Sequence, residues 1–331
     1  MFQLGTAGIF IINGATADLG GAGTLALTNG LQISAGSITT LSSDKTLAGP
    51  GALTNLGTLD LNSRTLTAAT APVFVGTNLT AINRNGGSPL AGKIVLSSGT
   101  LTYGGVLTAT NSGATLTGGE VFDLFDATTF TGAFTATNLP ALGAGLNWWT
   151  GSLTNNGTIK VNRSPVATNL TLGVSVGAAN TLQIIGGKNS PTDADADVLA
   201  VAAVTPGANG TVSFTSTNVT YTSTNSAGSD SFTYTVSDGF GGTATGTVNV
   251  STYSAEGFNR LLPVGSISNG IFNLSYLGIP GTNYALDWAT NLTPPINWVG
   301  LVTNQAATNG YLLFSVTNSG DVNFFRTRYA P

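Results

Sequence analysis

Three aspartates on alternate positions are the strongest chemical signal in this sequence. Asp193, Asp195 and Asp197 stand together in the stretch SPTDADAD. Calcium is bound by several oxygen ligands from one bent segment, so this grouping favours a calcium site. In an extended strand the three carboxylates would all point to one side and repel one another, and a bound cation would relieve that repulsion.

The acidic stretch is not an EF-hand loop. If Asp193 takes the first position, Val198 occupies the sixth, where glycine is required, and Val204 the twelfth, where glutamate is required. The alternative to a calcium site is a solvated acidic loop, and the residues leave both interpretations open.

A second acidic stretch, GEVFDLFD, contains Glu120, Asp123 and Asp126. A pair of carboxylates is what glycoside hydrolysis requires. On a strand, however, Glu120 and Asp126 lie on one face and Asp123 on the other, and no neighbouring histidine, cysteine or lysine assists them. We therefore interpret these residues as polar groups at strand ends, predict no catalytic residue and do not expect the chain to be an enzyme.

The tryptophans are the candidates for stacking against sugar rings. Trp148 and Trp149 are consecutive, so a strand sends them to opposite faces and one of them can lie outside. Trp149 and Trp288 are the two predicted platforms, and Trp298 is a further candidate. In the alternative interpretation the consecutive pair covers an open end of the fold, while the later tryptophans pack inward in a small domain.

The composition excludes several classes of function. Charged residues make up 7% of the 331 residues, the net charge is −4, and cysteine and histidine are absent. Thiol chemistry, disulfides and the usual zinc sites are therefore excluded, and no basic stripe is present to bind nucleic acid. The apolar run from Ala7 to Ile12 is too short for a membrane span and is not a signal peptide. The composition is nevertheless typical of exported proteins, and we expect the natural start to lie upstream of Met1.

The patterning is that of an all-β protein. Sustained helical periodicity is absent, whereas short alternating strands such as GTLDLNSRTLTA, residues 57–68, recur between glycine and asparagine turns. The phrase Gly-x-Leu returns at Gly23, Gly51, Gly99 and Gly151. One such strand cannot bury its apolar face alone but stacked copies can, so residues 1–163 are predicted to form a parallel β-solenoid.

Two further domains are expected. SPVATN, residues 164–169, is the linker candidate, because a proline after a strand end cannot continue the ladder. Residues 164–252 fit an Ig-like or cadherin-like β-sandwich. Residues 253–331 fit a small C-terminal β domain in which Tyr284 and Trp288 share one face.

Each of the three segments resembles a bacterial family. Residues 102–149, which run from TYGGVL to GLNWW, resemble the closing part of autotransporter-associated β-strand repeats. The hairpin GSDSFTYTVSDGFGGTATGTVNV resembles bacterial cadherin-like and tandem Ig-like repeats. The stretch GIPGTNYALDWATNLTPPINWVGL, with the terminal FFRTR, is similar to a C-terminal module of large secreted proteins of Verrucomicrobia and their relatives.

These resemblances imply a modular bacterial protein, extracellular or on the cell surface, whose modules have no known catalytic role. In cadherin-like repeats, acidic residues near such a loop, and sometimes the aspartate of Ser-Asp-Gly, take part in calcium binding. This adds Asn189, Asp230 and Asp238 as candidate ligands, and a turn cap is the alternative for Asp238.

We expect a structural and adhesive function. The expected partners are cell-surface glycans or sibling subunits, with copies associating into a homo-oligomer, fibres or a coat. The alternative is a carbohydrate-binding accessory region of a secreted polysaccharide-degrading enzyme.

Overall fold

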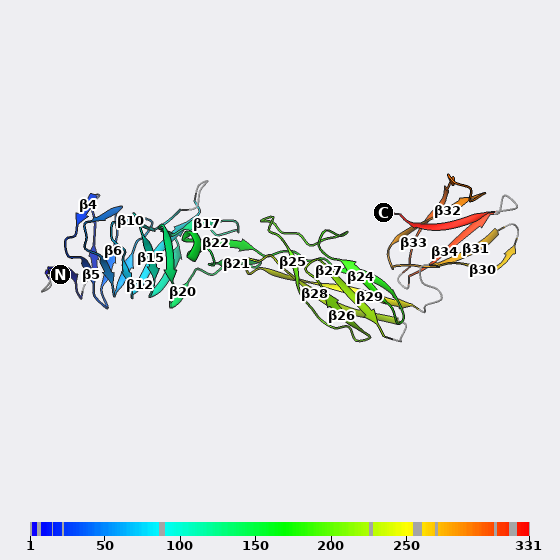
Figure 1. Cartoon of the computed structure of the whole chain (residues 1–331), viewed down its shortest axis with the longest axis horizontal. Coiled ribbons are helices and arrows are strands. Elements are labelled where there is room, and N and C mark those ends of the chain that lie inside the picture. The colour runs from blue at the N-terminus through cyan, green and yellow to red at the C-terminus, as the bar shows by residue number, and fades with distance from the viewer. Residues whose placement is uncertain are drawn as a thin grey trace. The chain divides into compact units, whose positions relative to one another are not determined.

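The computed structural model describes residues 2–4, 8–14, 16–21, 23–85, 90–224, 228–253, 260–268, 271–307, 310–317 and 323–330. These residues form strands and turns with one four-residue helix, so the prediction of an all-β chain is confirmed (Figure 1). None of the described helical segments is long and apolar enough to span a membrane. The chain divides into two compact units, Met1–Ser164 with Phe240–Gly242, and Pro165–Gly239 with Thr243–Pro331.

Parallel strands stack in three sheets in the first unit. The chain visits the sheets in a fixed order, so that each early circuit, or coil, adds one strand to each sheet. The first sheet contains β2 (Phe10–Ile12), β5 (Leu31–Ile33), β8 (Leu53–Asn55) and β11 (Val73–Phe74). The second contains β3 (Thr16–Asp18), β6 (Ile38–Thr40), β9 (Thr58–Asp60), β12 (Thr77–Asn83), β16 (Val106–Asn111) and β20 (Ala136–Asn138). The third contains β4 (Gly23–Ala26), β7 (Lys45–Ala48), β10 (Thr65–Ala68), β14 (Lys93–Leu96) and β18 (Phe125–Asp126).

Other strands extend this arrangement. β15 (Thr100–Tyr103) and β19 (Thr129–Gly132) pair in parallel as a separate sheet, while β1 (Phe2–Leu4) and β13 (Leu90–Ala91) pair antiparallel with β2 and β12. Parallel pairing between successive coils supports part of the solenoid prediction.

The coils lengthen along the chain. The hydroxyl of Thr70 donates to the carbonyl of Gly49 on the preceding coil, 21 residues earlier, whereas the hydroxyl of Thr135 donates to Gly105, 30 residues earlier. The Gly-x-Leu phrases are irregularly spaced for a different reason, because they precede strands of different sheets: Gly23 begins β4 of the third sheet, whereas Gly51 precedes β8 of the first.

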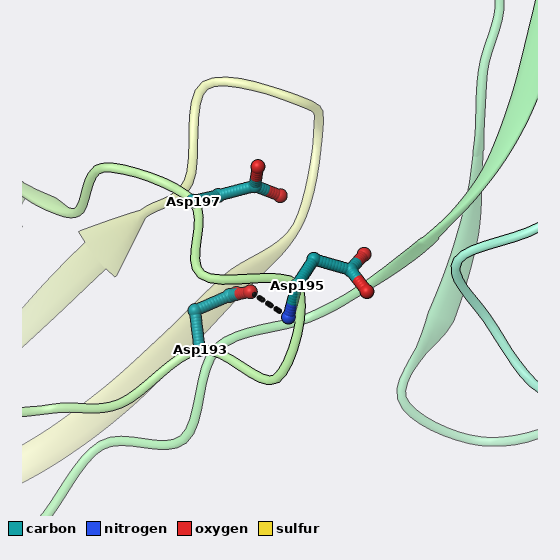
Figure 2. A group of neighbouring side chains, drawn as sticks. All are labelled: Asp193, Asp195 and Asp197. Carbon is teal, nitrogen blue, oxygen red and sulfur yellow. Dashed lines mark hydrogen bonds between the residues drawn. The ribbon is translucent and has the colours of Figure 1, made fainter.

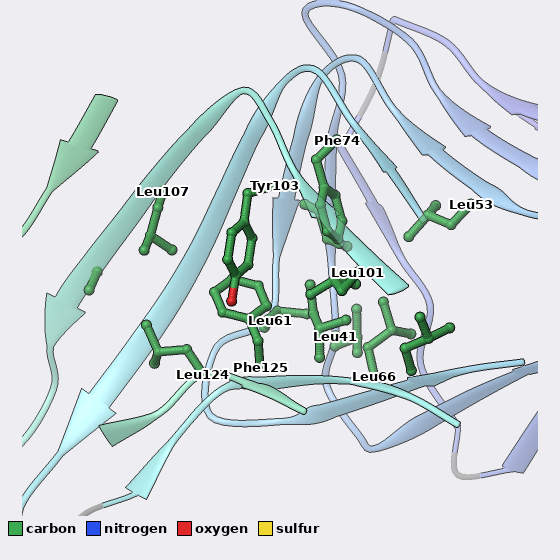
Figure 3. Packing of buried hydrophobic residues seen from close by; sticks show 14 of the residues in the cluster. Leu41, Leu53, Leu61, Leu66, Phe74, Leu101, Tyr103, Leu107, Leu124 and Phe125 are labelled. Atoms are coloured by element: carbon green, nitrogen blue, oxygen red, sulfur yellow. The ribbon is translucent and has the colours of Figure 1, made fainter. Parts of the chain in front are cut away.

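Alternate residues of the stacked strands point inward and form a hydrophobic column made mainly of leucines, here called the leucine column, together with the rings of Phe74, Tyr103 and Phe125 (Figure 3). Leu41, Leu66 and Leu101 are each 0% exposed, whereas the outward neighbour Thr67 is half-buried. Burying a leucine side chain contributes about 1.5–3 kcal/mol. Because no single coil encloses this column, each coil depends on its neighbours for its stability.

One corner of the coils requires glycine, because successive backbones approach closely there. A Cβ atom on Gly76 would lie 2.0 Å from the carbonyl oxygen of Gly57, and one on Gly105 would lie 2.1 Å from that of Gly76. Backbone hydrogen bonds from Thr77 to Gly57 and from Val106 to Gly76 hold the coils at this separation. Any side chain at this corner would push two coils apart.

Antiparallel strands and a short helix complete the first unit; one of these strands precedes β18 in the chain and the other two follow β20. The strands are β17 (Val121–Asp123), β21 (Leu146–Trp149) and β22 (Thr158–Arg163). The phrase at Gly151 predicts another strand, and this is wrong, because Leu153–Asn156 forms helix α1. Gly157 ends the helix with a φ of 73°, which favours glycine, and its N–H bonds the carbonyl of Leu153. The buried hydroxyl of Tyr103 donates to the same carbonyl at 2.7 Å.

Two sheets pack as a sandwich in the first part of the second unit. One sheet contains β23 (Leu170–Ser175), β29 (Thr243–Tyr253), β28 (Gly228–Ser237) and β25 (Ala200–Val204), in that order. The other contains β24 (Ala179–Gln183), β27 (Asn218–Ser223) and β26 (Gly210–Phe214). The core between them includes Val219, Tyr221, Phe232 and Tyr234, and the DSFTYTVSDG hairpin is formed by β28 and β29.

Two smaller sheets form the rest of the second unit. One has β31 (Ile271–Leu277) between β30 (Leu261–Ser268) and β34 (Tyr311–Thr317); the other has β32 (Asn283–Ala289) between β33 (Val299–Gln305) and β35 (Phe324–Tyr329). Leu286 on the inner face of β32 is 0% exposed, yet Asp287 on its outer face is only 2% exposed. Arg326 and Arg328 cover that carboxylate with hydrogen bonds of 3.0–3.1 Å from their Nε atoms.

Candidate functional site

Asp193, Asp195 and Asp197 lie in the loop between β24 and β25, where the chain is bent rather than extended (Figure 2). Ala196 has a φ of 61°, and the N–H of Asp195 donates a 2.7 Å hydrogen bond back to Oδ1 of Asp193. One carboxylate oxygen from each aspartate lies within 4.8 Å of the others. The structure therefore brings the predicted triplet together.

The bend gives the three carboxylates a partly enclosed setting. All three residues are half-buried, and Oδ2 of Asp193 is buried without a hydrogen-bond partner among the described residues. Three carboxylate oxygens are part of the six to eight oxygen ligands that calcium takes, with carbonyl groups and water supplying the rest. The 2.7 Å bond to Asp193 is also what a metal-free aspartate turn contains, so calcium binding stays a prediction.

Asp230 is held by the sandwich itself. Its carboxylate accepts hydrogen bonds from the Tyr221 hydroxyl at 2.6 Å and from the backbone N–H groups of Ala208, Asn209 and Ser231 at 2.8–2.9 Å. Burial alone would raise the pKa of Asp230, but these donors lower it below its usual value. Four donors already bond the carboxylate oxygens of Asp230. The residue does not belong to the group of three aspartates whose oxygens lie within 4.8 Å of one another.

Two other predicted calcium ligands lie at turns. Asp238 is 2% exposed at the end of β28, where the neighbouring Gly239 N–H donates to the hydroxyl of Ser237. Asn189 has a left-handed φ of 59° in the loop that precedes the triplet, and its carbonyl accepts a hydrogen bond from Thr168. Among the described residues, neither Asp238 nor Asn189 belongs to the group formed by Asp193, Asp195 and Asp197.

Glu120 shapes a loop of the first unit. Its carboxylate accepts the N–H groups of Thr117 at 2.9 Å and Gly118 at 2.8 Å, and it forms a 3.2 Å ion pair with Arg84. Burial would raise the pKa of Glu120, but the backbone donors outweigh it and lower the pKa. The residue is 7% exposed, so this carboxylate is committed to the loop.

Asp123 and Asp126 lie within reach of one lysine. Lys93 Nζ is 2.5 Å from Asp123 and 3.4 Å from Asp126. The prediction that they lie on opposite faces of a strand is therefore wrong. The chain turns a corner between β17 and β18, where Leu124 and Phe125 are both buried, so the alternation breaks. Burial would lower the pKa of Lys93, but the two carboxylates raise it.

The four tryptophans have different surroundings. Trp148 donates its Nε1–H to the Pro140 carbonyl at 2.8 Å and packs on Phe122. Trp149 stands edge-on to Phe240, which belongs to the same compact unit. Arg326 lies over the ring of Trp298 at 4.4 Å.

Trp288 is half-buried and borders a cleft of about 310 Å³. Asn291 and Asn297 line the same cleft, and the sequence did not single them out. The feature of the sequence that could have identified them is their position in the loop ATNLTPPINW, where they lie on either side of two prolines and between two tryptophans.

Residues 162–251 match the family model for bacterial Ig domains. The match covers the sandwich with its β28–β29 hairpin, and it supports an Ig-like repeat in a bacterial protein. Such a domain is a non-catalytic type, is common in extracellular and surface proteins, and fits a structural or surface-associated role. No curated protein matches the chain.

Proposed function

We propose that the chain is a non-catalytic structural and adhesive part of a bacterial cell-surface or secreted protein, and that its first unit is a β-solenoid. The observation that carries this proposal is the stacking of parallel strands in three sheets, followed along the chain by an Ig-type sandwich. The resemblances of residues 102–149 and of the C-terminal segment to exported bacterial proteins support the same location.

The proposed division is into residues 1–163, 164–252 and 253–331. Three separate hydrophobic clusters among the described residues support it, with buried members at 12–161, 170–250 and 274–316. A chain of domains with separate cores can present several surfaces while each domain keeps its own stability.

The stacked coils suit a mechanical role. Backbone hydrogen bonds join neighbouring coils in every sheet, and the leucine column adds burial between them. A force along the stack would therefore be shared by many bonds rather than by a few side chains.

We further propose that copies of the chain associate by adding strands at β33. β33 lies at the edge of its sheet, and its sequence VGLVTNQ contains no charge and no proline. Six of its seven residues are exposed. Edge strands are normally protected by lysine, proline or a covering segment, and a long uncharged edge can pair with the same edge of another copy.

Sedimentation velocity over a range of protein concentrations tests this association. Thr303→Lys places a charge on exposed β33 and should shift the protein toward monomers. Asn249→Lys is the matched control, because it adds the same charge at an exposed position of β29 that is paired with β23 on one side and β28 on the other. Monomers at every concentration, or equal loss of association in both variants, would rule out pairing at β33.

A carbohydrate-binding role is the second candidate function, and the cleft beside Trp288 favours it.

A further inference from the structure

A polar cleft opens beside the end of β32 in the C-terminal part of the second unit. It has a volume of about 310 Å³ and is lined by Trp288, Ala289, Thr290, Asn291, Asn297 and Val299. β32 ends at Ala289 and β33 begins at Val299, so one loop and the two strand ends that it joins supply all of the lining among the described residues. The cleft is therefore a local feature that does not depend on the position of any other domain.

Trp288 forms the aromatic wall of the cleft and is half-buried. It also borders a second cavity of about 40 Å³, which Leu301, Val316 and Phe325 line with it. A half-buried indole has less conformational freedom to lose than a fully exposed one when a ligand stacks on it.

The remaining lining is neutral and hydrogen-bonding. Asn291 uses its Oδ1 to accept the N–H of Thr293 at 3.1 Å, which secures the loop and leaves its NH₂ group as the part that can donate to a ligand. Asn297 is exposed, and Thr290 adds a hydroxyl. The described residues that line the cleft include no charged side chain.

We propose that this cleft binds a neutral carbohydrate chain. A pyranose ring has a flat face of C–H groups that can stack on an indole, and its hydroxyls are both donors and acceptors that match asparagine amides. The neutral lining disfavours phosphate, uronate and metal ligands. The volume lies at the lower end of the range of about 300–1,000 Å³ for small-molecule sites, which suits a short part of a sugar chain.

The other tryptophans serve as internal comparisons. Arg326 lies over Trp298, and Trp149 stands against Phe240. Trp288 is the indole that borders the described amide-lined cleft. The sugar site rests on the second candidate function and gives it a location and a ligand class. It does not depend on strand addition at β33.

A glycan array followed by isothermal titration with the selected sugar tests the proposal on the full chain. Cellohexaose is the neutral probe, with mannohexaose as its epimeric comparison and oligogalacturonate as the charged one. Trp288→Ala should abolish binding, and Asn297→Ala should raise the Kd about five- to tenfold, as expected for one lost hydrogen bond. Trp298→Phe is the matched control and should leave the Kd unchanged.

The variants also separate binding at the cleft from loss of the fold and from self-association. If Trp288→Ala unfolds the domain, Asn297→Ala decides the question, because an exposed loop asparagine is not needed for the core. Failure to bind any neutral sugar, selection of the acidic sugar, or an equal loss with Asn297→Ala and Trp298→Phe would overturn the proposal. Sedimentation of Asn297→Ala should match that of the unaltered chain, so failure here is distinct from failure of the strand-addition proposal.

Discussion

The hydroxyl of Tyr221 donates a 2.6 Å hydrogen bond to Oδ2 of Asp230. This bond joins β27 to the start of β28, and the same carboxylate secures the backbone of Ala208 and Asn209. The loop between β25 and β26, which contains these two residues, approaches Asp230 so closely that a Cβ on Gly207 would lie 2.4 Å from its Oδ2. The first aspartate of the DSFTYTVSDG hairpin thus fastens a loop to the sandwich.

Removing the hydroxyl of Tyr221 should lower the stability of the sandwich. Tyr221→Phe keeps the buried ring but deletes one donor to a carboxylate, and we expect a loss of about 1.5–3 kcal/mol in the free energy of unfolding. Urea denaturation followed by circular dichroism would measure it. Thr222→Ala, on the exposed face of the same strand, should change stability by less than about 0.5 kcal/mol. Equal effects of the two changes would show that the bond contributes nothing specific.

Acid should remove the contribution of Asp230. Its pKa is lowered in the folded protein, so its stabilising effect is fully present above the unfolded pKa of about 3.9 and is lost as pH falls through the lower folded pKa. Urea denaturation of the wild type and Asp230→Asn from pH 7 to pH 2.5 would test this. The difference between them should be largest near pH 7 and shrink below about pH 4. A constant difference across this range would contradict the lowered pKa.

Calcium should stabilise the second unit if the aspartate triplet binds it. At a free calcium concentration of 100 times the Kd, a site present in the folded state alone adds about 2.7 kcal/mol. Thermal melts with calcium and with chelator should therefore differ for the wild type and coincide for Asp195→Asn. Asp126→Asn changes an exposed carboxylate in the first unit and should keep the calcium response. Identical wild-type melts would exclude a stabilising calcium site.

The leucine column should determine the stability of the coils. Leu66→Ala removes a fully buried side chain from β10, which is paired on both sides, and we expect a loss of about 2–5 kcal/mol. Thr67→Ala, at the adjacent outward position, should cost far less. Hydrogen exchange of the amides of the first unit would report the loss in that unit alone. Similar exchange rates in the two variants would mean that the column is not what holds the coils together.

Alternation predicted the strands well because a period of two is a local property. The leucines of GTLDLNSRTLTA can be assigned to the interior from their neighbours alone, and Leu59 and Leu66 are indeed fully buried. The same rule failed at Asp123 and Asp126, since it cannot locate a corner where two consecutive residues both turn inward.

For the candidate sites, too, the sequence predicts what neighbouring residues determine and misses what only folding brings together. The aspartate triplet was visible because its three members are close in sequence. The sequence could not show that Asp230 has a different role from the triplet. The donors that bond its carboxylate come from residues 208, 209 and 221, which only folding brings near. Asn291 and Asn297 were missed because the chain must reverse between β32 and β33 before they line one cleft.

The close approach at Gly57, Gly76 and Gly105 also limits how such a chain can evolve. These glycines fall at the same corner of successive coils, so inheritance can copy or delete a complete turn and leave every later residue at its former corner. A duplication that ends within a strand would instead place a side chain where two backbones nearly touch, or turn the leucines of that strand outward. Growth of the gene by whole turns is therefore the route that preserves the fold.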